Sequence, residues 1–232
     1  DIPAYVQDGV VDAGVVGLNV VRERACRVEV ADELGFGKCR LVLAVFKGAP
    51  YKCVRDLAGK RIATSYPRIL KTYLDEKEIV AEIHQISGSV EIAPGIGLAD
   101  AICDIVSTGS TLVANGLREI ETVLHSQAVL VVQPHLPASK QALLARLRFR
   151  MQAVRRAGHT KYILLNAPNS RLGEIIGLLP ACKSPTVLPL ALEGWSSVHS
   201  VVEEDRFWEI IEKLKQAGAE GILVVPIEKM VI

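Results

Sequence analysis

The stretch Ala101–Gly116, AICDIVSTGSTLVANG, contains the pattern that decides the fold. Its apolar run over 101–106 carries a single carboxylate, Asp104, and predicts a buried strand. The run stops at Ser107–Thr111, four hydroxyl residues around a glycine, and residues 112–114 can open a helix. A strand that passes through a short turn into a helix is the repeating unit of an α/β fold.

Short strands alternate with helices over the first two thirds of the chain. Strands are predicted at 10–17, 37–46, 60–65, 82–87 and 100–106, with two more within 121–132. Helices are predicted at 2–8, 67–78 and 91–98, from about residue 110, and at 139–158. Strands that are separated by helices imply βαβ units and parallel strand pairing.

The pattern changes after Gly158. Strands are predicted at 161–167, 186–191, 195–202 and 221–227, and apolar residues at helical spacing fall within 172–179 and 207–214. The order βαββαβ is typical of a split-βαβ, ferredoxin-like domain. We therefore expect a domain boundary near residue 157.

The composition bounds the class of protein. The 232 residues are 50% hydrophobic, which is enough to bury a core, and the net charge of +1 gives no reason to expect a nucleic acid or membrane partner. Five scattered cysteines without metal-ligand or CxxC spacing predict reduced thiols in a cytoplasmic protein. No apolar run reaches the roughly 18 residues of a membrane span.

The turn after the 101–106 strand is a candidate anion site. Backbone N–H groups at such a turn point toward one spot, and Thr108, Ser110 and Thr111 add hydroxyl donors. Gly109 lets the backbone approach a ligand closely. Asp104 is near enough in sequence to hold sugar hydroxyls or a metal. The alternative is an ordinary polar turn with a satisfied aspartate.

Three more side chains are candidates, each with an ordinary alternative. Glu91, in the turn GSVE (88–91), fits either a helix cap or a second carboxylate over the same sugar. Asp12, inside an apolar stretch, fits either a cleft wall or a strand edge. Tyr66 follows Ser65 at the end of a strand, where α/β sheets bind ligands, but it also simply precedes a helix that starts with proline.

Together these motifs resemble the ATP phosphoribosyltransferase family, the first enzyme of histidine biosynthesis. The resemblance is carried by DGVVDAGVVG (8–17), GKRIATSYP (59–67), GSVEIAPGIGLADAICDIVSTGSTLVANGL (88–117), KYILLNAP (161–168), SPTVLPL (184–190) and ILVVPIEKM (222–230). It implies transfer of the 5-phosphoribosyl group of phosphoribosyl diphosphate to N1 of ATP, with release of diphosphate. It also implies that Mg²⁺ accompanies the diphosphate, that histidine inhibits the enzyme, and that the chain forms a homo-oligomer, a dimer or hexamer.

The implied fold is a bilobal core, like that of periplasmic binding proteins, followed by a regulatory domain. Lobe I would take 1–39 and 124–157, lobe II would take 40–123, and the histidine-binding domain would take 158–232. The family has a further segment before the position of Asp1, which supplies the first strands of lobe I. Without that segment lobe I is incomplete and exposes a sheet edge, so we expect the segment to belong to the full-length protein.

The resemblance also assigns roles in the catalytic core. The phosphoribosyl-diphosphate loop covers Ser107, Thr108, Gly109, Ser110 and Thr111, and Leu112 follows it. Glu91 and Asp104 would meet the ribose hydroxyls and stabilise an oxocarbenium-like state. Asp12 and Tyr66 would lie on the cleft wall near the nucleotide. Adenine N1 is already nucleophilic, so no dedicated general base is expected.

In the regulatory domain, the resemblance implies a histidine that binds between subunits and meets Asn166, Cys182 and Thr186. Two other functions remain open from the residues alone. One is a small-ligand receptor with the same bilobal shape, and the other is a histidine-binding regulator built on an inactive transferase. The second of these is disfavoured because the hydroxyl loop, Ser107–Thr111, and the two carboxylates, Glu91 and Asp104, are all present.

Overall fold

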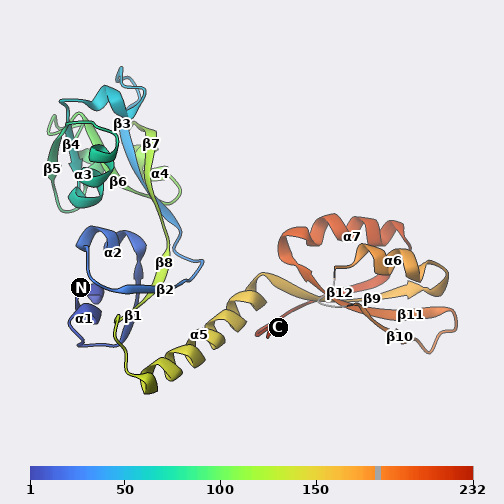
Figure 1. Ribbon diagram of the computed structural model, residues 1–232. Coiled ribbons are helices and arrows are strands. Elements are labelled where there is room, and N and C mark those ends of the chain that lie inside the picture. The colour runs from blue at the N-terminus through green and yellow to red at the C-terminus, as the bar shows by residue number, and fades with distance from the viewer. Residues whose placement is uncertain (181–183, 232) are drawn as a thin grey trace. The chain divides into compact units, whose positions relative to one another are not determined.

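The computed structural model of the chain describes residues 1–180 and 184–231. These residues form two compact units, Asp1–Ala138 and Ser139–Ile232 (Figure 1). The boundary between the units therefore falls at the start of the long helix at 138–158, whereas the sequence predicts a domain boundary near residue 157. The assignment of lobes and of a regulatory domain to residue ranges stays a prediction.

The larger sheet of the first unit has five strands. Their order is β5 (Glu82–Gln85), β4 (Arg61–Thr64), β6 (Ala101–Val106), β3 (Cys39–Phe46) and β7 (Leu117–Ser126). Strand β4 pairs in parallel with both β5 and β6, as the βαβ pattern predicts. Strand β3, however, pairs antiparallel with β6 and β7, so the sheet is mixed and parallel pairing is confined to β5, β4 and β6. The chain enters this sheet along β3 and leaves it along β7, and two neighbours that run in and out must be antiparallel (Figure 1).

Both faces of the five-stranded sheet are covered. Helix α3 (Pro67–Glu76) buries Leu70 and Leu74 against one face. On the other face, the short helix α4 (Ser110–Ala114) buries Leu112 beside Val90, in a cluster with the inward side chains of β3 and β6. A central sheet with apolar cover on both sides accounts for the apolar runs that the sequence shows in β3 and β6.

The second sheet of this unit has three antiparallel strands. Their order is β1 (Ala13–Gly17), β8 (Ala128–Val132) and β2 (Glu29–Glu33). Helices α1 (Ile2–Gln7) and α2 (Leu18–Arg24) pack on it through Val6 and Val21. Neither α2 nor β2 was predicted, because α2 is only two turns long and β2, EVADE, is mostly polar.

One predicted helix is absent. Residues 91–98 were expected to be helical, but only a 3₁₀ turn forms there, at Val90–Ile92. Pro94 and the glycines at 95 and 97, the second with a φ of +74°, are poor helix residues, and they explain why the turn does not continue. The stretch is instead a compact coil that leads directly into β6.

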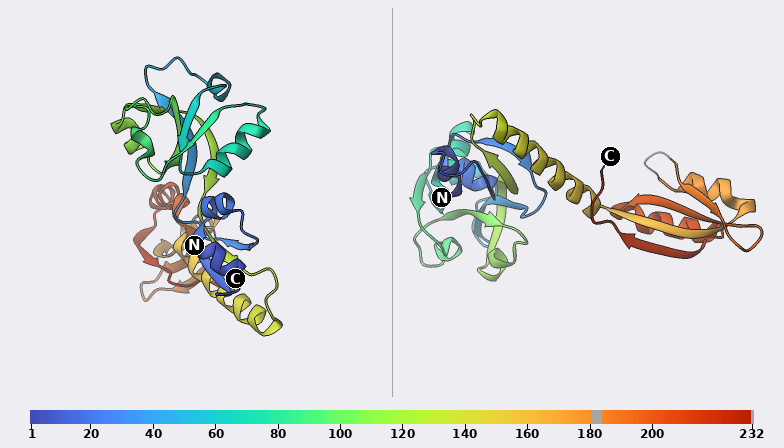
Figure 2. Two further views of the ribbon diagram at one scale, coloured as in Figure 1. Left: turned by 90° about the vertical axis from the view of Figure 1, so that its left-hand side faces the viewer. Right: turned by 90° about the horizontal axis from the view of Figure 1, so that it is seen from below.

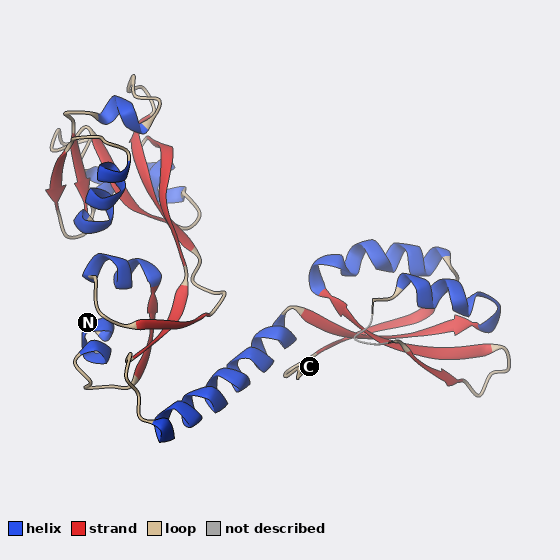
Figure 3. Cartoon of the chain, viewed as in Figure 1, coloured by secondary structure: helices blue, strands red, loops and turns tan. Residues whose placement is uncertain are grey.

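The second unit confirms the ferredoxin-like pattern. Helix α5 (Ala138–Gly158) is one continuous helix that leads into β9 (Figure 2). The sheet that follows has the order β10 (Thr186–Pro189), β11 (Trp195–Glu203), β9 (Thr160–Pro168) and β12 (Glu220–Pro226), and all its pairs are antiparallel. Along the chain, helix α6 (Leu172–Leu178) follows β9, and helix α7 (Phe207–Gln216) lies between β11 and β12 (Figure 3). They bury Ile175 and Leu214 against Ile163, Leu165 and Val198.

Because each unit has its own core, we expect the two to unfold separately when one core is damaged. Leu165→Ala removes a side chain that is 1% exposed from the second unit and should destabilise that unit by about 2–5 kcal/mol. Leu43→Ala is the matched change in the first unit, where Leu43 is fully buried. Differential scanning calorimetry should show a different transition lowered in each variant. A single transition lowered equally by both would contradict two independent cores.

Candidate functional site

Three loops meet at one edge of the five-stranded sheet. Strands β5, β4 and β6 are parallel neighbours, with Thr64 opposite both Gln85 and Cys103. Their carboxyl ends therefore lie side by side, and the chain leaves them through the loops that begin at Ser65, Ile86 and Ser107. Open α/β sheets bind their ligands at this edge.

The structure brings Glu91 and Asp104 together at this edge. Asp104 lies on the same face of β6 as Ile102 and Val106, which pack in the same core cluster as Val90. Burial raises the pKa of the Asp104 carboxyl, and the negative charge of Glu91 raises it further. The Ile105 N–H, which donates to Asp104 Oδ1 at 2.8 Å, opposes that shift. Two neighbouring carboxylates, one of them partly buried, form a site that favours a cationic or hydroxyl-rich ligand.

The hydroxyl loop faces solvent as the sequence suggests. Ser107, Thr108, Ser110 and Thr111 are all exposed, and Thr108 Oγ1 lies 3.1 Å from Ser110 Oγ. Gly109 has a φ of +84°, a conformation that glycine adopts without strain, and it starts helix α4.

Leu112 attaches the end of this loop to the hydrophobic core. Its side chain is 4% exposed and packs in the core, so Leu112 can take part in binding only through its backbone.

Tyr66 is held in place by Thr64, whose side chain is fully buried. The Thr64 hydroxyl donates to Cys103 O at 2.7 Å and accepts the Tyr66 N–H at 2.9 Å. At the far end, the Tyr66 hydroxyl accepts a hydrogen bond from Asn19 Nδ2 at 3.4 Å. Burial raises the pKa of Tyr66, and the charge of Asp104 adds to that effect. Tyr66 and Asp104 are thus close enough to interact electrostatically.

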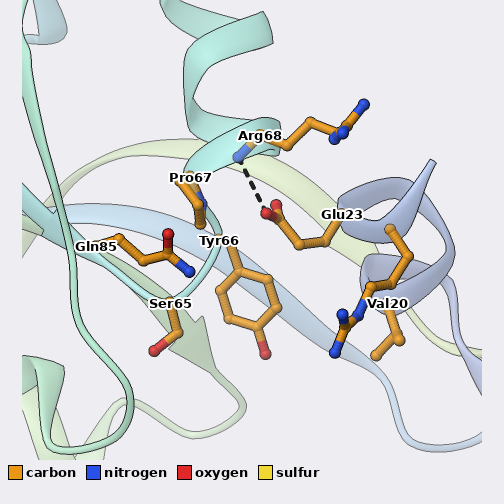
Figure 4. Close-up of a pocket in the computed structure, with 8 residues that line it drawn as sticks. Val20, Glu23, Ser65, Tyr66, Pro67, Arg68 and Gln85 are labelled. Atoms are coloured by element: carbon orange, nitrogen blue, oxygen red, sulfur yellow. Dashed lines mark hydrogen bonds between the residues drawn. The ribbon is translucent and has the colours of Figure 1, made fainter. Parts of the chain in front are cut away.

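A cavity of about 600 Å³ opens beside Tyr66 (Figure 4). It is lined by Val20, Glu23, Arg24, Ser65, Tyr66, Pro67, Arg68 and Gln85. Figure 4 shows Ser65, Tyr66 and Gln85 on one side of it and Glu23 on the side of α2. Sequence reasoning missed every lining residue from α2, because that helix was not predicted. The available signal was a glycine, Gly17, that ends an apolar strand two residues before Asn19.

Asp12 is not among the residues that this edge brings together. It lies just before β1 rather than inside a strand, and its carbonyl accepts the Gln133 N–H at 3.1 Å. Asn19, which contacts Tyr66, follows the other end of β1. Asp12 and Asn19 therefore lie beyond opposite ends of the strand. The turn that ends at Asp12 is fixed by Tyr5 O, which accepts the N–H groups of Val10 and Val11.

In the second unit, Asn166 and Thr186 share the sheet face opposite α6 and α7. Asn166 pairs in register with Ser197, and Thr186 pairs with His199. Along β9 and β11, Asn166, Ser197 and His199 alternate with buried residues. Gly221 lies so close that a Cβ there would sit 3.1 Å from Asn166 Nδ2. Cys182, the third predicted contact, lies outside the described residues.

The same face holds a short hydrogen-bonded chain that sequence reasoning missed. His199 Nδ1 lies 3.0 Å from the Tyr162 hydroxyl, and His199 Nε2 lies 3.0 Å from Ser197 Oγ. The chain adds polar groups beside Asn166 and Thr186.

The described residues contain no group of three or more His, Cys, Asp and Glu side chains that could hold a metal by themselves. Mg²⁺ prefers six oxygen ligands and commonly takes one or two carboxylates together with phosphate oxygens and water. The pair of Glu91 and Asp104 fits that partial role. Over the same residues, no helix is long and apolar enough to cross a bilayer.

Two family models match this chain. The model described as "ATP phosphoribosyltransferase" matches residues 1–153, and "HisG, C-terminal domain" matches residues 157–229. An ATP phosphoribosyltransferase of Cytophaga hutchinsonii is 59% identical over 231 residues, which are 100% of this chain and 81% of that protein. One of Phocaeicola vulgatus is 56% identical over 232 residues and 82% of its own length.

Solved structures give the same result. The ATP phosphoribosyl transferase (HisG:HisZ) complex from Thermotoga maritima has a TM-score of 0.57 and 32% identity, over 64% of this chain and 72% of that one. The substrate binding protein of an amino acid ABC transporter has a TM-score of 0.50 at 17% identity, over 67% and 70%. This second likeness concerns the fold alone, and it confirms the periplasmic-binding-protein-like core.

The raised pKa of Asp104 predicts that this carboxylate costs stability. Above its folded-state pKa, the ionised native form is penalised relative to the unfolded chain, and the penalty disappears as the pH falls below the ordinary Asp pKa of 3.8, which applies to the unfolded chain. Asp104→Asn should therefore raise the thermal midpoint by a few degrees at pH 7 and change it little at pH 3. Unfolding followed by circular dichroism at the two pH values measures this difference.

Asp100 provides a control of opposite sign. The Arg61 guanidinium, which bonds to Asp100, lowers the pKa of that carboxyl, so its ionised form stabilises the fold. Asp100→Asn should lower the midpoint at pH 7, and the loss should shrink as the pH falls through the folded-state pKa. If Asp104→Asn also lowered the midpoint at pH 7, the penalty assigned to Asp104 would be wrong.

Proposed function

The chain belongs to the ATP phosphoribosyltransferase family, which catalyses the first step of histidine biosynthesis, and we propose that the edge formed by β4, β5 and β6 is its active site. The reaction moves the 5-phosphoribosyl group of phosphoribosyl diphosphate to N1 of the ATP adenine and releases diphosphate. The observation that supports this site is the meeting of the hydroxyl loop 107–111 with Glu91 and Asp104 at the ends of parallel strands.

We assign the hydroxyl loop to the 5-phosphate of the donor. Ser107, Thr108, Ser110 and Thr111 are exposed, and Gly109 leaves the backbone accessible at the start of α4. Hydroxyl and backbone N–H donors that are already in place bind a phosphate without reorganisation. Leu112 contributes by fixing the loop on the core.

The two carboxylates act on the ribose. Glu91 and Asp104 would accept hydrogen bonds from its hydroxyls, and their negative charge would stabilise the positive charge that develops at the anomeric carbon. Burial makes the interaction with Asp104 stronger than it would be in water. Tyr66 and the cavity beside it, including Gln85, would hold the adenine so that N1 faces that carbon.

Mg²⁺ is the cofactor of this proposal. Bound to the diphosphate, it would neutralise the leaving group, and Glu91 and Asp104 are the protein carboxylates within the site that could add ligands. The use of ATP and the free cysteines among the described residues, Cys26, Cys39, Cys53 and Cys103, favour the cytoplasm. A homo-oligomer stays a prediction.

The direct test is an assay of the full-length enzyme with ATP, phosphoribosyl diphosphate and Mg²⁺. Phosphoribosyl-ATP and diphosphate should form together, and the absence of both would contradict the proposal.

Thr111→Ala should raise the KM for phosphoribosyl diphosphate by about tenfold, because a hydrogen bond to a charged phosphate is worth ~1.5–3 kcal/mol. Val113→Ala is the control, since Val113 lies in the same helix and is 61% exposed. Unchanged kinetics for Thr111→Ala would count against the phosphate assignment.

The regulatory assignment has its own test. We propose that histidine binds the open sheet face of the second unit beside Asn166 and Thr186, with Cys182 as a further contact. Histidine should slow the enzyme, and Asn166→Ala should raise the histidine concentration needed for half-inhibition by about tenfold. The rate without histidine should not change.

Trp208→Ala is the matched control for this test. Trp208 is 73% exposed on α7, the helix that covers the other face of the sheet, so the variant should keep normal inhibition. If Asn166→Ala and Thr186→Ala both kept normal inhibition as well, the histidine site would have to lie elsewhere.

A further inference from the structure

Helix α3 receives its N-terminal cap from a distant part of the chain. The Glu23 carboxylate accepts the backbone N–H group of Arg68 at 3.1 Å (Figure 4). It also accepts that of Ile69 at 3.0 Å. Tyr66, which occupies the N-cap position, makes no side-chain cap bond, and Pro67 has no N–H to offer. A carboxylate at a helix N-terminus satisfies free donors and interacts favourably with the helix dipole.

The cap joins the two sheets of the first unit. Glu23 belongs to α2, which follows β1 of the three-stranded sheet, and α3 follows β4 of the five-stranded sheet. The two helices pack together beside the cavity that contains Tyr66. The position of α3 against α2 therefore depends on a bond to a charged side chain rather than on apolar packing alone.

A second contact from α2 acts on the same segment. Asn19 donates to the Tyr66 hydroxyl, and Asn19 is itself fixed by Ser126, whose hydroxyl accepts the Asn19 N–H and donates to Asn19 Oδ1, both at 3.0 Å. Asn19 of helix α2 thus holds the hydroxyl of Tyr66. Glu23 of the same helix holds the backbone N–H groups of Arg68 and Ile69, which follow Tyr66 in the chain.

We propose that Glu23 is a positioning residue for the nucleotide substrate. By capping α3, its carboxylate keeps Tyr66 and the first turn of α3 in the arrangement that forms the wall of the cavity. This inference rests on the proposed function. It specifies that the effect reaches ATP and not phosphoribosyl diphosphate, because both backbone N–H groups that Glu23 accepts belong to the first turn of α3, which follows β4, and not to the loop after β6.

The experiment measures both KM values and kcat in the full-length enzyme for Glu23→Ala, Glu23→Gln and Asp75→Ala. Glu23→Ala should raise the KM for ATP by about tenfold and leave kcat and the KM for phosphoribosyl diphosphate within about twofold. Glu23→Gln keeps an oxygen that can accept one of the N–H groups, so it should restore most of the affinity. Asp75→Ala breaks the exposed ion pair with Lys71 on the same helix and should change none of these values.

Hydrogen exchange supplies a readout that is independent of activity. The Arg68 and Ile69 amides should exchange faster in Glu23→Ala than in the wild type or in Asp75→Ala. Faster exchange with an unchanged KM for ATP would overturn the inference. The inference would also be overturned if both KM values rose and kcat fell by similar factors, because such a change would show a purely structural role. If Glu23→Ala failed to fold, Glu23→Gln, which keeps one acceptor oxygen for the two N–H groups, should still show a smaller rise in the KM for ATP and faster exchange of the freed amide, and the absence of both changes would overturn the inference.

The two proposals fail in different ways. A wild-type enzyme that forms no phosphoribosyl-ATP would overturn the proposed function and this inference with it. A wild-type enzyme that is active, together with Glu23→Ala of normal affinity for ATP, would overturn the role of Glu23 alone.

Discussion

The parallel pairing of β4 with both β5 and β6 is the constraint on which the candidate site depends. Parallel neighbours end at the same edge, so three loops that are far apart in sequence meet there. The buried Thr64 hydroxyl strengthens this arrangement, because it links Cys103 of β6 to the backbone of Tyr66. A one-residue slip between β4 and β6 would move Asp104 to the opposite face and away from Glu91. Position and chemistry are therefore set by the same strand register.

The site is built at some cost to the fold. Asp104 is a carboxylate in a strand whose neighbours are apolar, and burial raises its pKa. The turn that carries Glu91 begins with Gly88 and Ser89, both with positive φ, a conformation that is unfavourable for serine. Proteins commonly accept destabilising features where the function requires them. Two such features beside one another are easier to explain by a bound sugar than by the stability of the fold.

The two units differ in the number and arrangement of their sheets. The first has two sheets, and α2 and α3 connect them through a charged cap and a tyrosine that is held at both ends. The second has one antiparallel sheet with helices on a single face, and the other face carries Asn166, Thr186 and the chain centred on His199. An α/β sheet edge suits phosphates and sugars, while an open sheet face suits a small ligand or another chain. The proposed division between catalysis and regulation follows these two kinds of surface.

The sequence by itself determined the elements with strong periodic patterns: the strands of the larger sheet, helix α5 and the βαββαβ order of the second unit. It also singled out Glu91, Asp104 and the 107–111 loop as candidates, because charged and hydroxyl residues within or directly after an apolar run are local signals. It could not show α2, whose two turns are stabilised by packing rather than by propensity. Nor could it show that β3 and β7 run antiparallel, since direction follows from the path between two sheets. Only the tertiary structure decided that Asp12 and Asn19 lie beyond opposite ends of β1 and that Glu23 caps α3, because a distance between residues far apart in the chain exists only once the chain is folded.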